Sequence, residues 1–420
     1  MIQTKTLFPG VRVTLIQSQK FKTGCFSVNF LVPHRAETAA RNALIPSVLL
    51  RGSRSLPDIG AISRRLDELY GASVGTIARK KGETQVVGLY ADFIEDVLVG
   101  EPVFRQMTEL VEDLLFHPLT QENAFDPDAV EGEKENLRNA MAGALNDKRI
   151  YAVRRLLKTM CADESYGIPS IGEEWSLPGI GPADLYADYL ALLSNARVEL
   201  FYMGRQDPDA VVSVLRQMLL PLPQTQRQAL LPVADVVPGA PRTVIESMEL
   251  SQSKLCIGCR MPQASDLQDL AAKLVFQVIF GAGTTSKLFL RVREELSLCY
   301  YASASYDKYK GILLISAGID RENYDQAKDE ILSQLDECAS GRFTSDDLEL
   351  ARDQLVSQLN QDLDNPGRLE EYYIGQAVQG TEQSIEALRS QIEQVTPEAV
   401  RAAAASVRLD TIYLLEGVEA

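Results

Sequence analysis

The residue types that most often bind transition metals are few in this chain and poorly spaced for the purpose. The only two histidines, His34 and His117, lie too far apart in the sequence to form the pair of ligands, one helical turn apart, that short zinc motifs use. Cys256 and Cys259 form a C-x-x-C pair within LCIGCRM, a segment typical of a buried strand. Residues three apart on a strand point to opposite faces, so the thiols diverge. The spacing therefore predicts no metal site, and we expect no cofactor.

Other side chains that could support chemistry have a more ordinary interpretation. Glu131, Glu133 and Glu135 could hold a hard cation such as Mg²⁺, but a charge run on a helix usually forms a solvated face. GAGTTSK at 281–287 lacks the spacing of a phosphate-binding loop and predicts a turn between helices. His34 is expected in the turn that follows a strand.

The elements that would position these residues repeat once along the chain. Each half opens with two strand-like segments and closes with a helix and a strand; the opening segments are VRVTLIQSQ and GCFSVNFLVP in one half, TVIESMELS and KLCIGCRMP in the other. The Pro-rich segment 221–242 has no clear period and predicts a linker. We therefore expect an α+β fold with domains at 1–220 and 243–420, two homologous halves that are each an antiparallel-rich sheet covered by helices.

Composition excludes several classes of partner. The chain has 420 residues and a formal net charge of −16, with a sequence pI of about 4.8. An acidic surface repels phosphate backbones and anionic lipid, so nucleic acid and membrane partners are disfavoured. Six cysteines without framework spacing fit a reducing compartment. No signal-peptide pattern stands at the start of the sequence, and we expect a cytoplasmic protein.

Several segments carry a likeness to a known family; they are the R-x-E at 35–37, RGS at 51–53, LDELYGASV at 66–74, GAGTTSKLF at 281–289 and VREELSLCYYASAS at 292–305. Over essentially its whole length the chain resembles the insulinase/pitrilysin peptidases, or inverzincins, and especially the smaller two-lobed members similar to the mitochondrial processing peptidase. The resemblance implies that Arg293 and Tyr300, which match an Arg/Tyr pair of the family, reach from the second half and help to hold substrate near the metal.

The same resemblance locates a missing reaction centre. The family's H-x-x-E-H helix supplies two zinc-binding imidazoles and a carboxylate that activates the metal-bound water. Here those positions are Ala43, Pro46 and Ser47, none of which can replace the lost groups. The third ligand, a later Glu, is expected near 133–141, where Asn139 or Ala140 stands in its place. Proline inside a helix removes a hydrogen bond, so we expect the helix to be kinked at Pro46 or to begin near it.

These departures imply a protein that binds peptide without cutting it. The stretch at 146–175 is most similar to the inactive member of a bacterial pair of such peptidases. The resemblance therefore implies a non-catalytic subunit, with an active homologous zinc peptidase, or a second copy of itself, as its partner in a dimer. The segment at 70–84 would be the edge strand that pairs with an extended peptide.

Two alternatives stay open. The chain could be a peptide-binding homo-oligomer that has no catalytic partner. It could also be an active hydrolase with an unusual site, for which acids near Asp128 or Glu131 would have to supply the chemistry.

Overall fold

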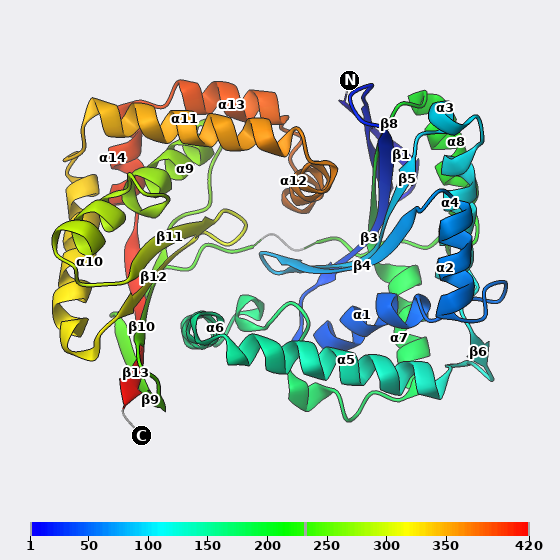
Figure 1. Ribbon diagram of the computed structural model, residues 1–420, viewed down its shortest axis with the longest axis horizontal. Coiled ribbons are helices and arrows are strands. Elements are labelled where there is room, and N and C mark those ends of the chain that lie inside the picture. The colour runs from blue at the N-terminus through cyan, green and yellow to red at the C-terminus, as the bar shows by residue number, and fades with distance from the viewer. Residues whose placement is uncertain (1, 231–232, 419–420) are drawn as a thin grey trace. The chain divides into compact units, whose positions relative to one another are not determined.

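The computed structural model describes residues 2–230 and 233–418, which form two compact units (Figure 1). Unit 1 comprises the described parts of Met1–Ala142, Ile168–Pro232 and Pro366–Thr381, and unit 2 those of Gly143–Gly167, Val233–Asn365 and Glu382–Ala420. Each unit therefore includes one segment from the other half of the sequence. The boundaries predicted at 1–220 and 243–420 assign residues 143–167 to the first domain and 366–381 to the second, whereas the structure has them in unit 2 and unit 1.

The predicted linker 221–242 is only partly described, because residues 231 and 232 lie outside the described residues. Its described residues from 223 to 241 form neither helix nor strand.

Five strands of each sheet follow one topology, in agreement with the predicted repeat of elements, and the sheet of unit 1 has one further strand at its edge. In unit 1 the order is β1 (Ile2–Phe8), β2 (Val11–Gln17), β8 (Arg197–Gly204), β3 (Thr23–Pro33), β5 (Thr84–Ile94) and β4 (Ser73–Lys81). In unit 2 it is β9 (Arg242–Glu249), β13 (Arg408–Val418), β10 (Ser253–Arg260), β12 (Ile312–Ile319) and β11 (Tyr301–Asp307). In unit 1, β8 lies between β2 and β3 and runs parallel to β2. In unit 2, β13 lies in the same way between β9 and β10 and runs parallel to β9. All other pairs in the two sheets are antiparallel.

Helices cover one face of the unit 1 sheet and enclose an aromatic core. They are α1 (Ala36–Leu49), α2 (Ile59–Glu68), α3 (Asp96–Val99), α4 (Val103–Phe116), α5 (Pro127–Asn146), α7 (Pro182–Asn195) and α8 (Pro208–Met218), with the short hairpin β6 (Thr120–Gln121) and β7 (Ala124–Phe125) between α4 and α5. Phe104 of α4 packs edge-on against Tyr202 of β8 and Phe26 of β3, with ring centres 5.0 and 5.8 Å apart. All three rings are buried, so they hold α4 on the sheet.

Unit 2 is built in the same way. Its helices are α9 (Leu267–Gly281), the π-helical segment η3 (Leu288–Glu295), the short turn η4 (Arg321–Asn323), α10 (Tyr324–Ala339), α11 (Ser345–Asp362), α13 (Ile385–Glu393) and α14 (Pro397–Ala405). Helix α11 begins with a capping box formed by Thr344 and Asp347. Among the residues that the structure describes, no helix combines the length and apolar character that crossing a bilayer requires.

A helix from the opposite half of the sequence packs on the second face of each sheet. In unit 1 this helix is α12 (Pro366–Gln379), which contacts β8 and β3. Its buried Glu370 accepts hydrogen bonds from Ser27 and Asn29 of β3 and forms an ion pair with Arg79 of β4, at 2.7 Å. A buried carboxylate needs such partners, so Glu370 ties α12 to this sheet.

In unit 2 the exchanged helix is α6 (Lys148–Met160), followed by the short turn η1 (Ser165–Gly167). It packs on β10 and β13. Glu164, just after the helix, pairs with the buried cations Arg260 and Lys310, at 2.5 and 2.6 Å. The remaining short turn, η2 (Glu174–Ser176), belongs to unit 1 and carries the only tryptophan, Trp175, which is 62% exposed.

Candidate functional site

The three positions that correspond to the missing metal motif all lie on α1. Ala43 and Pro46 are buried, and Ser47 is partly exposed. The expectation that the helix begins near Pro46 is wrong, because α1 starts at Ala36 and runs through Pro46 to Leu49. Pro46 lies in the last turn, so its missing N–H removes only one bond near the end of the helix, and its own carbonyl still accepts from the N–H of Leu50 at 3.2 Å.

A buried amide pair supports α1 just before the proline. Asn42 donates to the side chain of Gln85 on β5 at 3.0 Å, and Gln85 donates to the carbonyl of Ala39 at 2.8 Å. Both side chains are buried, so these bonds satisfy amides that would otherwise destabilise the core. The helix is thus held against the sheet without any metal.

The three glutamates of the acidic run on α5 differ in their surroundings, because two face solvent and one contacts the region after α1. Glu131 and Glu135 are exposed and pair with Lys134 and Arg138 on their own helix, as expected for a solvated face. Glu133 instead pairs with Arg51, which follows α1. Nothing in the sequence indicated this contact, because the two residues lie far apart and each has closer charged neighbours. The expected third-ligand positions, Asn139 and Ala140, are both exposed.

The residues around this pair line an open cavity of about 360 Å³. Ser47 and Arg51 of the α1 region, Glu133 of α5 and Thr76 of β4 contribute to its wall, with the apolar remainder from α1, α2 and β4. Within residues 2–230 and 233–418, no three His, Cys, Asp or Glu side chains are grouped so that they could hold a metal ion. The position where the family carries its metal therefore lies beside a guanidinium–carboxylate pair.

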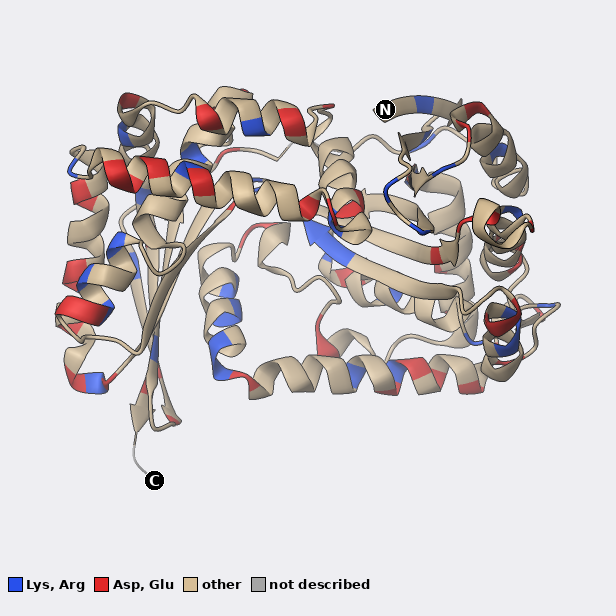
Figure 2. Ribbon diagram, turned by 45° about the horizontal axis from the view of Figure 1, so that its top comes forward, with Lys and Arg blue, Asp and Glu red and all other residues tan. Residues whose placement is uncertain are grey.

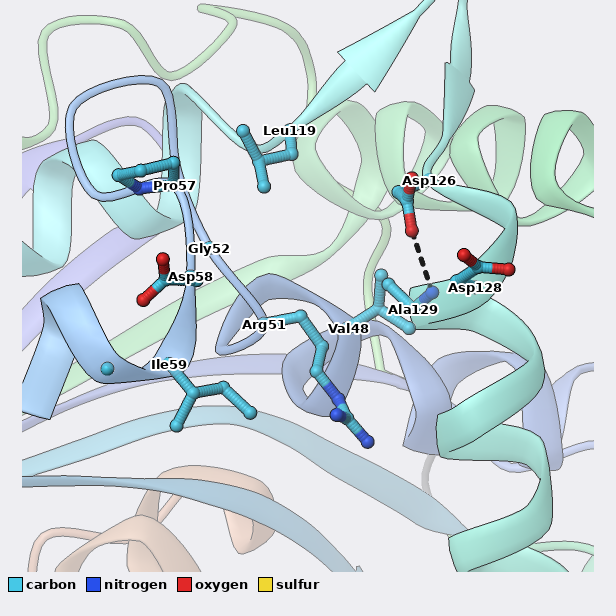
Figure 3. Close-up of a pocket in the computed structure, with 11 residues that line it drawn as sticks. Val48, Arg51, Gly52, Pro57, Asp58, Ile59, Leu119, Asp126, Asp128 and Ala129 are labelled. Atoms are coloured by element: carbon cyan, nitrogen blue, oxygen red, sulfur yellow. Dashed lines mark hydrogen bonds between the residues drawn. The ribbon is translucent and has the colours of Figure 1, made fainter.

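A second cavity, of about 570 Å³, lies beside the first and shares Arg51 with it. Figure 3 shows the Arg51 side chain extending away from Asp126 and Asp128, which lie across the cavity. Asp126 is engaged at the start of α5, where it accepts from the N–H of Ala129 at 2.8 Å. Glu131, the other acid considered for an unusual hydrolytic site, is paired with Lys134.

Strand β4, which borders the first cavity, lies at the edge of its sheet. The segment 70–84 was expected to provide such an edge, and this prediction is confirmed. Lys81 pairs with Thr84 across a two-residue turn, and antiparallel neighbours alternate in the direction of their main-chain groups. The N–H and C=O groups of Val74, Thr76 and Ala78 therefore face away from β5. A Cβ added at Gly75 would meet nothing within 4 Å, so the strand is accessible.

Arg293 and Tyr300 both lie in unit 2, each with its own neighbours. The Arg293 guanidinium lies 4.7 Å from the ring centre of Phe289 and pairs with the adjacent Glu294 at 3.5 Å. Tyr300 is 58% exposed, and its hydroxyl donates to Asp320 at 3.2 Å, which raises the pKa of the phenol. Among the described residues, no hydrogen bond or ring contact joins Arg293 to Tyr300.

The remaining sequence candidates have structural surroundings. Cys256 and Cys259 are buried in β10 as free thiols, and burial raises the pKa of each to about 12, so neither is reactive near neutral pH. The segment 281–287 forms the turn between α9 and η3, as predicted. His34 does follow a strand, but its side chain is buried, with Nε2 3.1 Å from the carbonyl of Ile168. Burial lowers the pKa of His34 to about 4.

Comparisons with known proteins agree with this geometry. A family model described as peptidase M16 inactive domain matches residues 179–355. The chain is 30% identical over 422 residues to the probable inactive metalloprotease YmfF of Bacillus subtilis (strain 168), covering 99% of this chain and 98% of that protein.

Two solved structures have the same fold as this chain. The crystal structure of a conserved protein from Enterococcus faecalis V583 matches with a TM-score of 0.88 and 29% identity, covering 99% of each chain. The crystal structure of a peptidase M16 inactive domain from Pseudomonas fluorescens has a TM-score of 0.80 at 18% identity, covering 100% of this chain and 98% of that one, which is a likeness in fold.

The Bacillus relative is described as probably inactive, and the family resemblance places Ala43, Pro46 and Ser47 at the zinc motif, outside the residues 179–355 that the family model matches. The protein is accordingly a non-catalytic homologue of metallopeptidases. With nearly complete coverage of both chains at 30% identity, it belongs to the peptidase M16 family, the insulinase/pitrilysin group that its sequence resembles.

Proposed function

We propose that this protein is the non-catalytic subunit of a paired peptidase, which binds peptide while an active H-x-x-E-H homologue cuts it. The observation that carries the proposal is the survival of a peptide-accepting edge beside a cleft whose metal-binding positions are lost. Ser47, Glu133 and Thr76 still surround one cavity, and β4 still presents a free edge. Selection for a stable fold alone does not require an accessible edge strand, which is an aggregation hazard.

Peptide binding at β4 needs no metal. An extended peptide laid along the strand would form main-chain hydrogen bonds with Val74, Thr76 and Ala78, and its alternate side chains would face the cavity beside α1. The exposed part of the strand, Ser73–Thr76, is the natural place for such pairing to begin. The proposal places this work in the cytoplasm, which six buried free thiols support.

The test of pairing is affinity purification of the tagged chain from its native cells, followed by mass spectrometry. We expect a chain of similar size that carries an intact H-x-x-E-H, in roughly one-to-one amount. Recovery of this protein alone, or only with copies of itself, would contradict the proposed pairing with an active homologue. It would favour the second candidate, a peptide-binding homo-oligomer, because the edge of β4 could bind peptide without a partner.

A further inference from the structure

Helix α6 is basic in a chain whose formal net charge is −16. Its 13 residues, KRIYAVRRLLKTM, include Lys148, Arg149, Arg154, Arg155 and Lys158 but no acidic residue. Figure 2 shows blue residues gathered along this helix, whereas red residues are spread over the long helices elsewhere. A concentration of one sign against an opposite overall charge calls for a physical explanation.

The helix is firmly seated, so its charges are held in place. Ala152, Leu156 and Met160 are buried against the sheet of unit 2. Gly258 of β10 permits this approach, because a Cβ there would lie 2.5 Å from the sulfur of Met160. Arg155 is fixed by an ion pair with Glu246 on β9, at 2.8 Å.

Four other cations in this region have no carboxylate partner among the described residues. Arg149 stacks on the ring of Tyr301 at 4.0 Å, and Lys254 of β10 lies 6.0 Å from the centre of the same ring. Lys148 donates to the main-chain carbonyl of Leu145 at 3.3 Å, and Arg154 lies further along the helix. In the part of the chain that the structure describes, none of these four side chains forms an ion pair.

The neighbouring carboxylate is already in use. Asp147 caps α6 by accepting from the N–H groups of Arg149 and Ile150, at 2.8 and 3.3 Å. Like charges held close together repel one another, and burial together with Arg149 lowers the pKa of Lys254. With 58 acidic residues in the chain, partners for these cations were available to the fold, yet no acidic residue that the structure describes forms an ion pair with them.

We propose that the basic surface formed by Lys148, Arg149 and Lys254 binds an acidic segment of a polypeptide through its carboxylates. Leu145 and Ile150, 41% and 44% exposed, lie beside the first turn of α6 and suit apolar side chains of such a segment. A nucleic acid is disfavoured, because its long phosphate backbone would also meet the negative charge of the rest of the protein. The inference rests on the proposed function and names the kind of peptide held.

The test is fluorescence anisotropy of the full-length protein with a labelled peptide of alternating Glu and Ser, compared with the same peptide carrying Gln for Glu. We expect the acidic peptide to bind more tightly and its affinity to fall as NaCl rises. The double variant Lys148→Glu/Arg149→Glu should bind it about tenfold more weakly. Both substitutions keep good helix formers, and circular dichroism checks the fold.

The matched control is Arg342→Glu/Arg401→Glu, which makes the same change in net charge at exposed positions of unit 2 away from α6. Equal weakening by both double variants would overturn the basic surface as a site. So would an unlabelled single-stranded oligonucleotide that competes as well as the acidic peptide, or self-association that Lys148→Glu/Arg149→Glu abolishes while no peptide binds. Equal binding of the acidic and Gln peptides would overturn this inference alone and leave peptide binding at β4 intact.

Discussion

At the scale of single residues, the lost zinc site is replaced by ordinary core packing and one ion pair. Ala43 and Pro46 are buried, and Arg51 pairs with Glu133 beside the cavity. A guanidinium at this place is itself a fixed positive charge, so the cleft disfavours a second cation.

Restoring the motif alone should not restore zinc. The triple variant Ala43→His/Pro46→Glu/Ser47→His gains only two ligands, because the Glu of the motif acts on water, and stable protein sites use at least three. We expect it to retain well under one equivalent of zinc after dialysis, measured by inductively coupled plasma mass spectrometry. Adding Ala140→Glu should raise retention. One full equivalent in the triple variant would show that a third ligand already exists.

His34 should make the protein less stable in mild acid. Its pKa is about 4 when folded and about 6.5 when unfolded, so between these values the unfolded chain binds more protons. The contribution is complete above pH 6.5 and is lost as the pH falls towards 4, by about 3 kcal/mol in total. Urea unfolding at several pH values should show this slope reduced in His34→Gln. Parallel pH profiles for the two proteins would contradict the assignment.

At the scale of elements, a free edge and an exchanged helix have separate consequences. Thr76→Pro removes a main-chain donor that faces away from β5, and proline is tolerated at such edge positions. We expect peptide affinity to fall about three- to tenfold, the value of one hydrogen bond, with little change in stability. Thr76→Ala keeps the N–H and is the control. Unchanged affinity for an uncharged extended peptide in Thr76→Pro would argue against pairing at β4.

Helix α12 should depend on one buried carboxylate. Glu370→Gln leaves Arg79 without its ion pair and weakens the bonds from Ser27 and Asn29. We expect a loss of about 2 kcal/mol in the free energy of unfolding, measured in urea. Arg368→Gln, in an exposed ion pair on the same helix, should change stability by less than about 0.5 kcal/mol. Similar losses for the two variants would show that the buried network is not the anchor.

At the scale of the whole molecule, Arg293 and Tyr300 test what the chain contributes to a partner. If they hold substrate in the pair, Arg293→Ala and Tyr300→Phe should raise KM of the reconstituted peptidase without preventing assembly. Arg291→Ala is the control, since that arginine lies in the same segment but pairs with Glu295 and Glu330. Size-exclusion chromatography with light scattering measures assembly. A change in KM no larger than that in Arg291→Ala would contradict a substrate-binding role for Arg293 and Tyr300.

Several features of this molecule could be read from residue types and order alone. The repeated order of strands and helices, with Pro-rich residues between, indicated two homologous α+β halves, and five strands of each sheet follow one topology. Ala43, Pro46 and Ser47 showed the loss of zinc chemistry, because the chemistry of a ligand is a property of the side chain itself. The edge strand at 70–84 was implied by the family resemblance, and its glycines and lysines are residue types that suit an edge.

Only the tertiary structure decided which distant residues meet. The pairing of Arg51 with Glu133, the burial of His34, and the exchange of α6 and α12 between units all join segments far apart in the sequence. A charge or an imidazole has many possible neighbours, and packing rather than residue type selects among them. The loss of the zinc motif was thus evident in the sequence, whereas the surroundings of that position, and the partners that the charges of α6 find, depend on how the chain folds.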